Sequence, residues 1–390
     1  MNVYLAVHTA PSENITIIDV QQMISSFNVV TNTVTSITTL KSEQDLIRRE
    51  NGHIQFWKEP RVVNKPADVM VSPEMQTSFL EGLEANGIQA TVYVDNVQTL
   101  IDNERGVRRQ GESFGWEDYY TLEEIHGWLN SLSETYPDVV TPIVGGSSYE
   151  GREILGVNIT FAPGNPVVVV EGGIHAGEWI GPATATWIIN QILTTNDSAV
   201  RDTVRQFNFY VFPNLNPDGY VYTWTTDRNW RGTRTPYTPC YGADPNRNWD
   251  FHWGEEGASS TVCSSDFAGP EPFSEVETRT FSEFLASLGD DFQVYLDFHS
   301  YGQMLMFQYG LYSVTAPNYD DLLVKLPLRS FELQIDKHSS VLREAVTDRV
   351  LHKKLLLEYM GCRIEMIFGK GYWADGNSVN MDDSLNVLQQ

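Results

Sequence analysis

The feature that most constrains the fold is a run of four valines, 167–170, followed by Glu171 and two glycines. A continuous β-branched run indicates a strand buried on both faces, as in parallel α/β sheets. The glycines permit a sharp turn after it. Residues 182–193 then carry apolar side chains at near-helical spacing with proline at the start. The stretch therefore predicts a strand, a tight turn and a helix.

His175 and Glu178 lie in this turn. In parallel α/β sheets, ligands bind in the crevice outside the carboxyl ends of the strands. A second histidine, His299, follows the strand predicted over 292–298. Two His and one Glu, two of them close in sequence and the third remote, form a catalytic type of zinc site. We predict one zinc ion per chain. The alternative for the first pair alone is a loop histidine beside a solvated carboxylate.

Two loops between these ligands contain arginine, 227–231 and 244–249. Because guanidinium pairs bidentately with carboxylate, the loops indicate binding of an anion next to the metal. The alternative is that each arginine pairs with an aspartate nearby in the chain. Asp297, two residues before His299, is expected on the other face of its strand and is not assigned as a ligand.

The composition excludes some partners. A formal net charge of −25 argues against nucleic acid, which needs clustered Lys and Arg. No apolar run approaches the roughly 20 residues of a membrane span, and no signal peptide is readable at the N-terminus.

Cys240 and Cys263 enclose a turn-rich loop and could form a disulfide. The alternative is that all three cysteines, including Cys362, are free thiols.

The chain divides near residue 110. Residues 1–34 are left unassigned, and 35–109 read as a small α+β unit. The unit ends in a basic, glycine-containing segment with Arg108 and Arg109, which suits cleavage by a trypsin-like protease; a plain polar loop is the alternative. Beyond it, strands and helices alternate, which predicts an α/β domain over 110–390. Strands are expected at 139–144, 154–159, 167–170, 207–212 and 292–298, and helices at 182–193 and 274–288. A further helix should begin at a Thr121–Glu124 capping box.

Six segments carry a resemblance to a known family: 56–60, 173–179, 216–219, 228–231, 246–249 and 299–301. In order and spacing, over roughly residues 35–323, the chain resembles the pancreatic-type zinc carboxypeptidases of the A/B group. The resemblance implies an eight-stranded mixed sheet flanked by helices, preceded by an open-sandwich inhibitory pro-domain over 35–109. It also implies a secreted, extracellular zymogen that acts on peptide and protein C-termini.

The resemblance also implies roles for individual residues. His175, Glu178 and His299 would bind zinc, and Arg231 would stabilise the oxyanion. Asn246 and Arg247 would hold the C-terminal carboxylate of the substrate, and Cys240 would pair with Cys263. In place of the arginine that usually precedes the zinc-binding glutamate, this chain has Gly177, so one peptide contact is expected to be missing.

The resemblance stops near Leu323. The family's general-base glutamate, its substrate-capping tyrosine and the residue at the base of its specificity pocket all follow that point. Glu365, in an apolar run, is the candidate base. The alternative function is therefore a pseudo-peptidase or binding protein that lacks the base, or a chain whose last part reflects a frame change in the gene. Preference for aromatic, aliphatic or basic C-terminal residues is left open.

Overall fold

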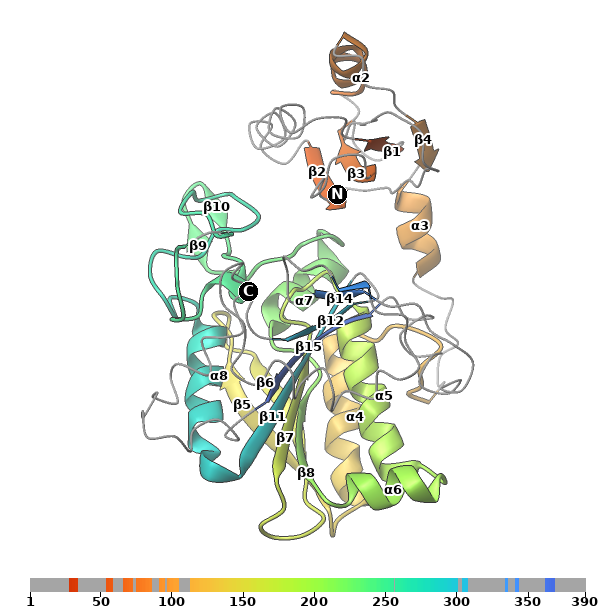
Figure 1. The fold of residues 1–390 in the computed structure, drawn as a ribbon, viewed down its shortest axis with the longest axis vertical. Coiled ribbons are helices and arrows are strands. Elements are labelled where there is room, and N and C mark those ends of the chain that lie inside the picture. The colour runs from red at the N-terminus through yellow and green to blue at the C-terminus, as the bar shows by residue number, and fades with distance from the viewer. Residues whose placement is uncertain are drawn as a thin grey trace. The chain divides into compact units, whose positions relative to one another are not determined.

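The structure is a computed structural model. It describes residues 28–33, 54–58, 66–72, 75–85, 91–94, 97–104, 113–255, 257–300, 304–307, 334–335, 341–343 and 362–368. These residues form two units, the first from 1–112 and 222–229, the second from 113–221 and 230–390. Figure 1 shows the elements of both, and each unit is described by itself.

The first unit contains a four-stranded sheet with the order β2-β3-β1-β4. Its strands are β1 (Asn28–Thr33), β2 (Ile54–Lys58), β3 (Pro66–Val71) and β4 (Thr91–Val94), and its helices are α2 (Gln76–Ala85) and α3 (Val97–Glu104). Phe79 and Leu83 supply the buried face of α2. At the end of α3, Glu104 accepts hydrogen bonds from Nε and Nη2 of Arg228, both at 2.6 Å.

The second unit contains a nine-stranded mixed sheet with the order β13-β14-β12-β15-β11-β7-β8-β6-β5. The expected number was eight. The strands are β5 (Val140–Ser147), β6 (Glu153–Ile159), β7 (Val167–Gly172), β8 (Asn208–Phe212), β11 (Phe292–Ser300), β12 (Met304–Phe307), β13 (Gln334–Ile335), β14 (Val341–Arg343) and β15 (Cys362–Phe368). A separate two-stranded sheet joins β9 (Pro236–Tyr237) and β10 (Cys240–Tyr241).

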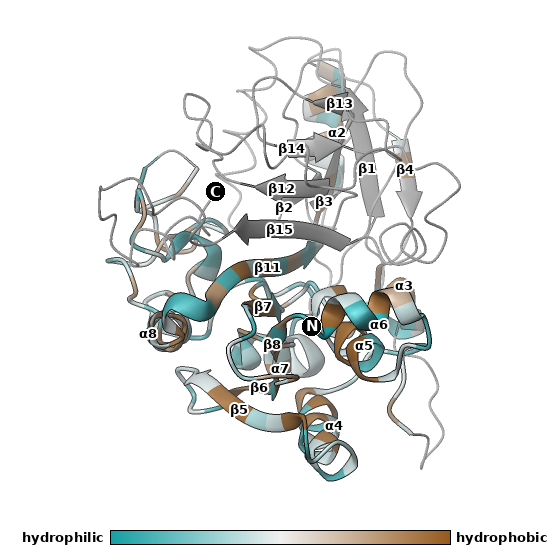
Figure 2. Ribbon diagram, turned by 60° about the horizontal axis from the view of Figure 1, so that its bottom comes forward, coloured by the Kyte–Doolittle hydropathy of each residue, from teal (hydrophilic) through white to brown (hydrophobic). Residues whose placement is uncertain are grey.

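Helices cover both faces of this sheet. Figures 1 and 2 agree in placing α4 and α5 side by side on one face and α8 on the other. The helices after residue 113 are α4 (Leu122–Thr135), α5 (Ile180–Thr194), α6 (Ser198–Val204), α7 (Pro217–Thr225) and α8 (Val276–Ser287), with short 3-10 turns η1 (Pro245–Arg247) and η2 (Gly289–Asp291). The predicted alternation of strands and helices is therefore confirmed.

The centre of the sheet is β7, which is buried along its whole length. It pairs in parallel with β8 on one side and with β11 on the other. The apolar side chains of these strands, among them Phe212 of β8 and Tyr295 of β11, pack in one cluster with Phe281 of α8 and Trp249, which follows η1. Figure 2 shows the hydrophobic colouring of the helices that pack on these strands. A parallel pair at the centre brings the carboxyl ends of β7 and β11 to one edge.

Local sequence signals agree with these elements. Thr121 caps α4, and Glu124 returns the hydrogen bond to complete the predicted capping box. The turn after β7 needs its glycines. Gly173 has a φ of +70°, and a Cβ on Gly172 would lie 2.7 Å from the backbone of Gly181 at the start of α5. Glycine therefore permits both the turn and the close approach of helix to strand.

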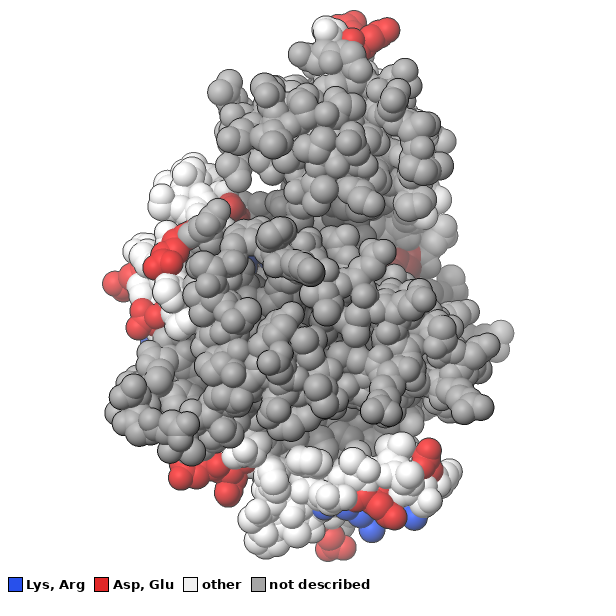
Figure 3. Space-filling model, viewed as in Figure 1, with Lys and Arg blue, Asp and Glu red and all other residues white. Residues whose placement is uncertain are grey.

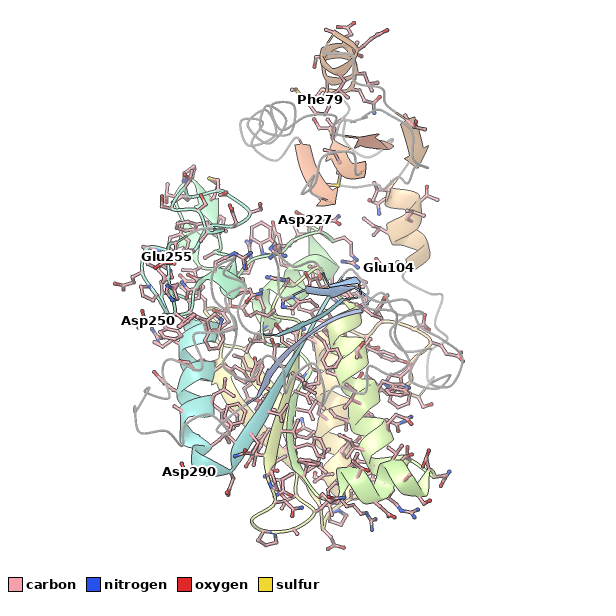
Figure 4. All side chains as sticks on the ribbon, in the orientation of Figure 1. Phe79, Glu104, Asp227, Asp250, Glu255 and Asp290 are labelled. Carbon is pink, nitrogen blue, oxygen red and sulfur yellow. A yellow bond between two sulfur atoms is a disulfide. The ribbon has the colours of Figure 1, made fainter. Side chains whose placement is uncertain are left out.

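Cys240 and Cys263 form a disulfide, as the resemblance implied. Asp250 and Glu255 lie on the exposed loop that it closes (Figure 4). Figure 3 shows acidic side chains at several places on one face of the molecule and basic ones mainly at its lower edge. Within the described ranges, no helix has the length and apolar character needed to cross a membrane. The sequence also predicts a strand over 34–40 and a helix over 42–50, and both lie outside the described residues.

Candidate metal centre

Two neighbouring parallel strands bring the three predicted ligands together. His175 and Glu178 lie in the turn between β7 and α5, where Glu178 N–H donates to the carbonyl oxygen of His175 at 3.2 Å. His299 is the next-to-last residue of β11, which pairs with β7. His299 is 121 positions from Glu178 and 124 from His175 in the sequence, but the sheet places all three residues at one edge.

The donor atoms converge closely. His299 Nδ1 lies 3.0 Å from His175 Nδ1 and 3.0 Å from Glu178 Oε2, and His175 Nδ1 lies 3.0 Å from Glu178 Oε1. Each side chain thus offers one ligand atom to a common point, and the set meets the spacing of a metal site. Two nitrogens bound tetrahedrally to zinc at about 2.0–2.1 Å stand roughly 3.3 Å apart, close to the separation of the two Nδ1 atoms.

The chemistry of the donors also fits a metal ion. The Nε2 atom of His175 lies 3.0 Å from Asp244 Oδ1, and that of His299 lies 2.5 Å from Asp297 Oδ2. A neutral imidazole has one protonated nitrogen, and each carboxylate requires that proton on Nε2. Both Nδ1 atoms then present lone pairs to each other and to the Glu178 carboxylate. A cation between them removes this repulsion.

Glu178 is held in its ionised form. Burial raises its pKa, but its electrostatic interaction with the His175 and His299 rings outweighs burial and leaves the pKa well below 4.5. The backbone N–H of Ser300 also donates to Glu178 Oε2 at 2.9 Å. A carboxylate with a low pKa is deprotonated at neutral pH, which metal binding requires.

Asp244 connects the metal site to the arginine loop. Its Oδ1 accepts from His175 Nε2 and from Asn246 N–H, whereas its Oδ2 accepts from Arg231 Nε at 3.0 Å and Nη2 at 2.8 Å. Burial raises the pKa of Asp244, and the charges of Arg231 and His175 overcome this and hold the pKa well below its usual value. One buried carboxylate thus orients both a ligand and a cation.

Arg231, predicted to stabilise the oxyanion, and the two predicted substrate-binding residues lie next to these groups. Arg231 is 39% exposed, and its Nη1 lies 3.5 Å from Glu178 Oε1. Asn246 is buried, with Nδ2 3.4 Å from His299 Nε2 and no partner for Oδ1 among the described residues. Arg247 donates to the carbonyl oxygens of Gly257 and Asn246. The alternative of pairing with local aspartate therefore holds for Arg231 and Asp244.

The two aspartates that contact the metal-site histidines were not predicted from the sequence. The assignment of Asp297 to the opposite face was wrong, because residues i and i+2 of a strand share a face. No role was predicted for Asp244, which was considered only within the loop 244–249. Metal-binding histidines commonly donate their second ring N–H to a carboxylate, and that rule could have pointed to it. Glu365, the candidate base, lies on β15, which is antiparallel to β11. In this register Glu365 is opposite Asp297, and Arg363 is opposite His299.

The chain matches two sequence families. Residues 125–348 match the zinc carboxypeptidase family and residues 28–104 match the carboxypeptidase activation peptide. The first match covers more than half of the chain, so this protein belongs to the zinc carboxypeptidase family.

Individual proteins agree with this membership. "Zinc carboxypeptidase A 1" of Anopheles gambiae is 46% identical over 271 residues, which are 68% of this chain and 63% of the relative. "Carboxypeptidase A2" of Mus musculus is 34% identical over 293 residues, 73% of this chain and 70% of the relative. The crystal structure of carboxypeptidase A from Helicoverpa armigera superposes with a TM-score of 0.69 at 27% identity, over 78% of this chain and 76% of that one. The match thus spans less than two thirds of the mosquito relative's length.

Proposed function

We propose that this chain is the precursor of a zinc-dependent metallocarboxypeptidase that removes the C-terminal residue of peptides and proteins. The observation that carries the proposal is the convergence of His175 Nδ1, Glu178 and His299 Nδ1, with both histidine Nε2 atoms committed to carboxylates. Family membership favours hydrolysis over binding alone.

Zinc held by these donors supplies a Lewis acid for the scissile carbonyl and lowers the pKa of a water molecule. The residues of the chain do the remaining work. Arg231, kept in place by Asp244, would stabilise the negative charge that develops on the carbonyl oxygen. Asn246 and Arg247 would bind the terminal carboxylate, which restricts the reaction to the last peptide bond.

Glu365 is our candidate for the general base. Its register position is opposite Asp297, two residues along the strand from the level of His299, which corresponds to about 7 Å. Glu365→Gln tests this assignment directly. The pseudo-peptidase alternative requires that no carboxylate of the chain performs this step.

Residues 35–109, which lie in the first unit, would be the inhibitory pro-domain, and 110–390 the catalytic domain. Cleavage near Arg108 and Arg109 by a trypsin-like protease would activate the enzyme. An extracellular setting is supported by the Cys240–Cys263 disulfide, since such bonds persist in oxidising compartments.

The experiment is hydrolysis of blocked dipeptides that end in Phe, Leu, Arg or Lys by the trypsin-treated, zinc-loaded protein, with His175→Ala as the control. We expect release of the last residue by the wild type and none by the variant. The dipeptide that is cleaved fastest gives the preference of the pocket. Tight peptide binding without turnover would support the pseudo-peptidase instead.

A further inference from the structure

Each candidate zinc histidine contacts a carboxylate, and Asp297, which contacts His299, is given no part in the reaction proposed above. Asp297 lies on β11, two residues before His299, and its side chain is 1% exposed. Its Oδ2 is 2.5 Å from His299 Nε2. This contact is shorter than the 3.0 Å between Asp244 Oδ1 and His175 Nε2. The Nε2 atoms of His175 and His299 are therefore contacted by two different carboxylates, those of Asp244 and Asp297.

The geometry points to a function for Asp297: we propose that it is a positioning residue that fixes the tautomer and the ring orientation of His299 for zinc. An imidazole that donates Nε2–H to a carboxylate must keep its lone pair on Nδ1, which is the atom directed at Glu178 and His175. The carboxylate also increases the basicity of the ring and so strengthens its bond to a metal.

Other groups around His299 do not replace Asp297. The amide nitrogen of Asn246 lies 3.4 Å from His299 Nε2, but an amide NH₂ is a donor and competes for the same nitrogen. The rings of His175 and His299 stand 4.7 Å apart with planes tilted by 43°, so they are not stacked. Asp297 supplies the carboxylate oxygen that can accept a hydrogen bond from His299 Nε2.

Glu171 lies at the same level of the sheet as Asp297. The two residues pair in register between the parallel strands β7 and β11, and both side chains are buried. A second acidic residue is therefore the direct neighbour of Asp297 on the adjacent strand.

This inference rests on the proposed zinc site and is tested by metal affinity. We would measure the zinc dissociation constant of the full chain at one pH by competition with a chromophoric chelator, and record the visible spectrum of the cobalt-substituted protein. Asp297→Asn keeps an oxygen that can accept from Nε2–H, and Asp297→Val removes it. We expect zinc affinity to fall about 10-fold for Asn and about 100-fold for Val, with altered cobalt bands.

Two further variants separate positioning from structure. Asp291→Asn removes an exposed carboxylate just before β11, at the end of the strand marked by Asp290 in Figure 4, and should leave affinity unchanged. Asp202→Asn removes a second exposed carboxylate, on α6, and should also leave zinc affinity unchanged. Unchanged affinity and cobalt spectrum in folded Asp297→Asn would overturn the inference. Failure of the wild type to bind zinc would instead overturn the proposed function.

Discussion

Glu277 should make the stability of this protein fall as the pH rises through the neutral range. The side chain is fully buried on α8, where Tyr149 N–H donates to Oε1 at 3.2 Å and Oε2 has no hydrogen-bond partner among the described residues. Burial is the main cause that raises the pKa of Glu277 to about 8, and the nearby negative charges of Asp218 and Glu275 add to it.

The size of the effect follows from the shift. A group whose pKa is higher in the folded state contributes stability that is complete below its unfolded pKa, near 4.5, and is lost as the pH rises through about 8. Each pH unit within that window costs about 1.4 kcal/mol. Between pH 6 and pH 9, ionisation of Glu277 should therefore remove roughly 3 kcal/mol from the free energy of unfolding.

The test compares urea unfolding of the wild type and Glu277→Gln at pH 6 and pH 9. Glutamine keeps the acceptor for Tyr149 N–H but cannot ionise. From pH 6 to pH 9 the free energy of unfolding of the variant should therefore fall by roughly 3 kcal/mol less than that of the wild type. Other titrating groups cancel in this difference. Parallel pH profiles for the two proteins would refute the reasoning.

Three other substitutions probe separate parts of the structure. Arg231→Ala should lower kcat by about 100- to 1,000-fold while zinc content stays the same, because the zinc ligands remain and the charge that develops in the transition state loses its partner; the exposed Arg201→Ala is its control. Asn248→Ala should lower the free energy of unfolding by about 3–5 kcal/mol, because the buried amide of Asn248 is hydrogen-bonded to Ala268 O, Ser274 Oγ, Glu275 N and Thr278 Oγ1. A variant as stable as the wild type in thermal or urea unfolding would disprove that role. Glu365→Gln should reduce turnover by about 100- to 10,000-fold at unchanged zinc affinity, and wild-type turnover would remove Glu365 as the base.

Local patterns made much of the fold predictable. The valine run of β7, the glycine turn and the Thr121–Glu124 box each encode their conformation within a few residues, and the structure has all three. The sequence order of two histidines and a glutamate at strand ends also predicted the metal site, because parallel pairing brings strand ends together.

Contacts that depend on register or on distant loops were harder to foresee. Asp244 reaches His175 from 69 residues away, and Glu171 meets Asp297 only because β7 and β11 pair in one particular register. Neither pairing leaves a periodic signal in the sequence. The ninth strand, β13, is two residues long, and two residues are too few to show the alternation that identifies a strand.

The central claim is that the site cuts only at a free C-terminus, and mass spectrometry of one peptide in two forms tests it most directly. The trypsin-treated, zinc-loaded protein would be incubated with the same peptide as the free acid and as the C-terminal amide. We predict stepwise loss of single residues from the acid and an intact amide, because we propose that Asn246 and Arg247 bind the terminal carboxylate. Equal cleavage of both forms, or internal cleavage of either, would contradict the account.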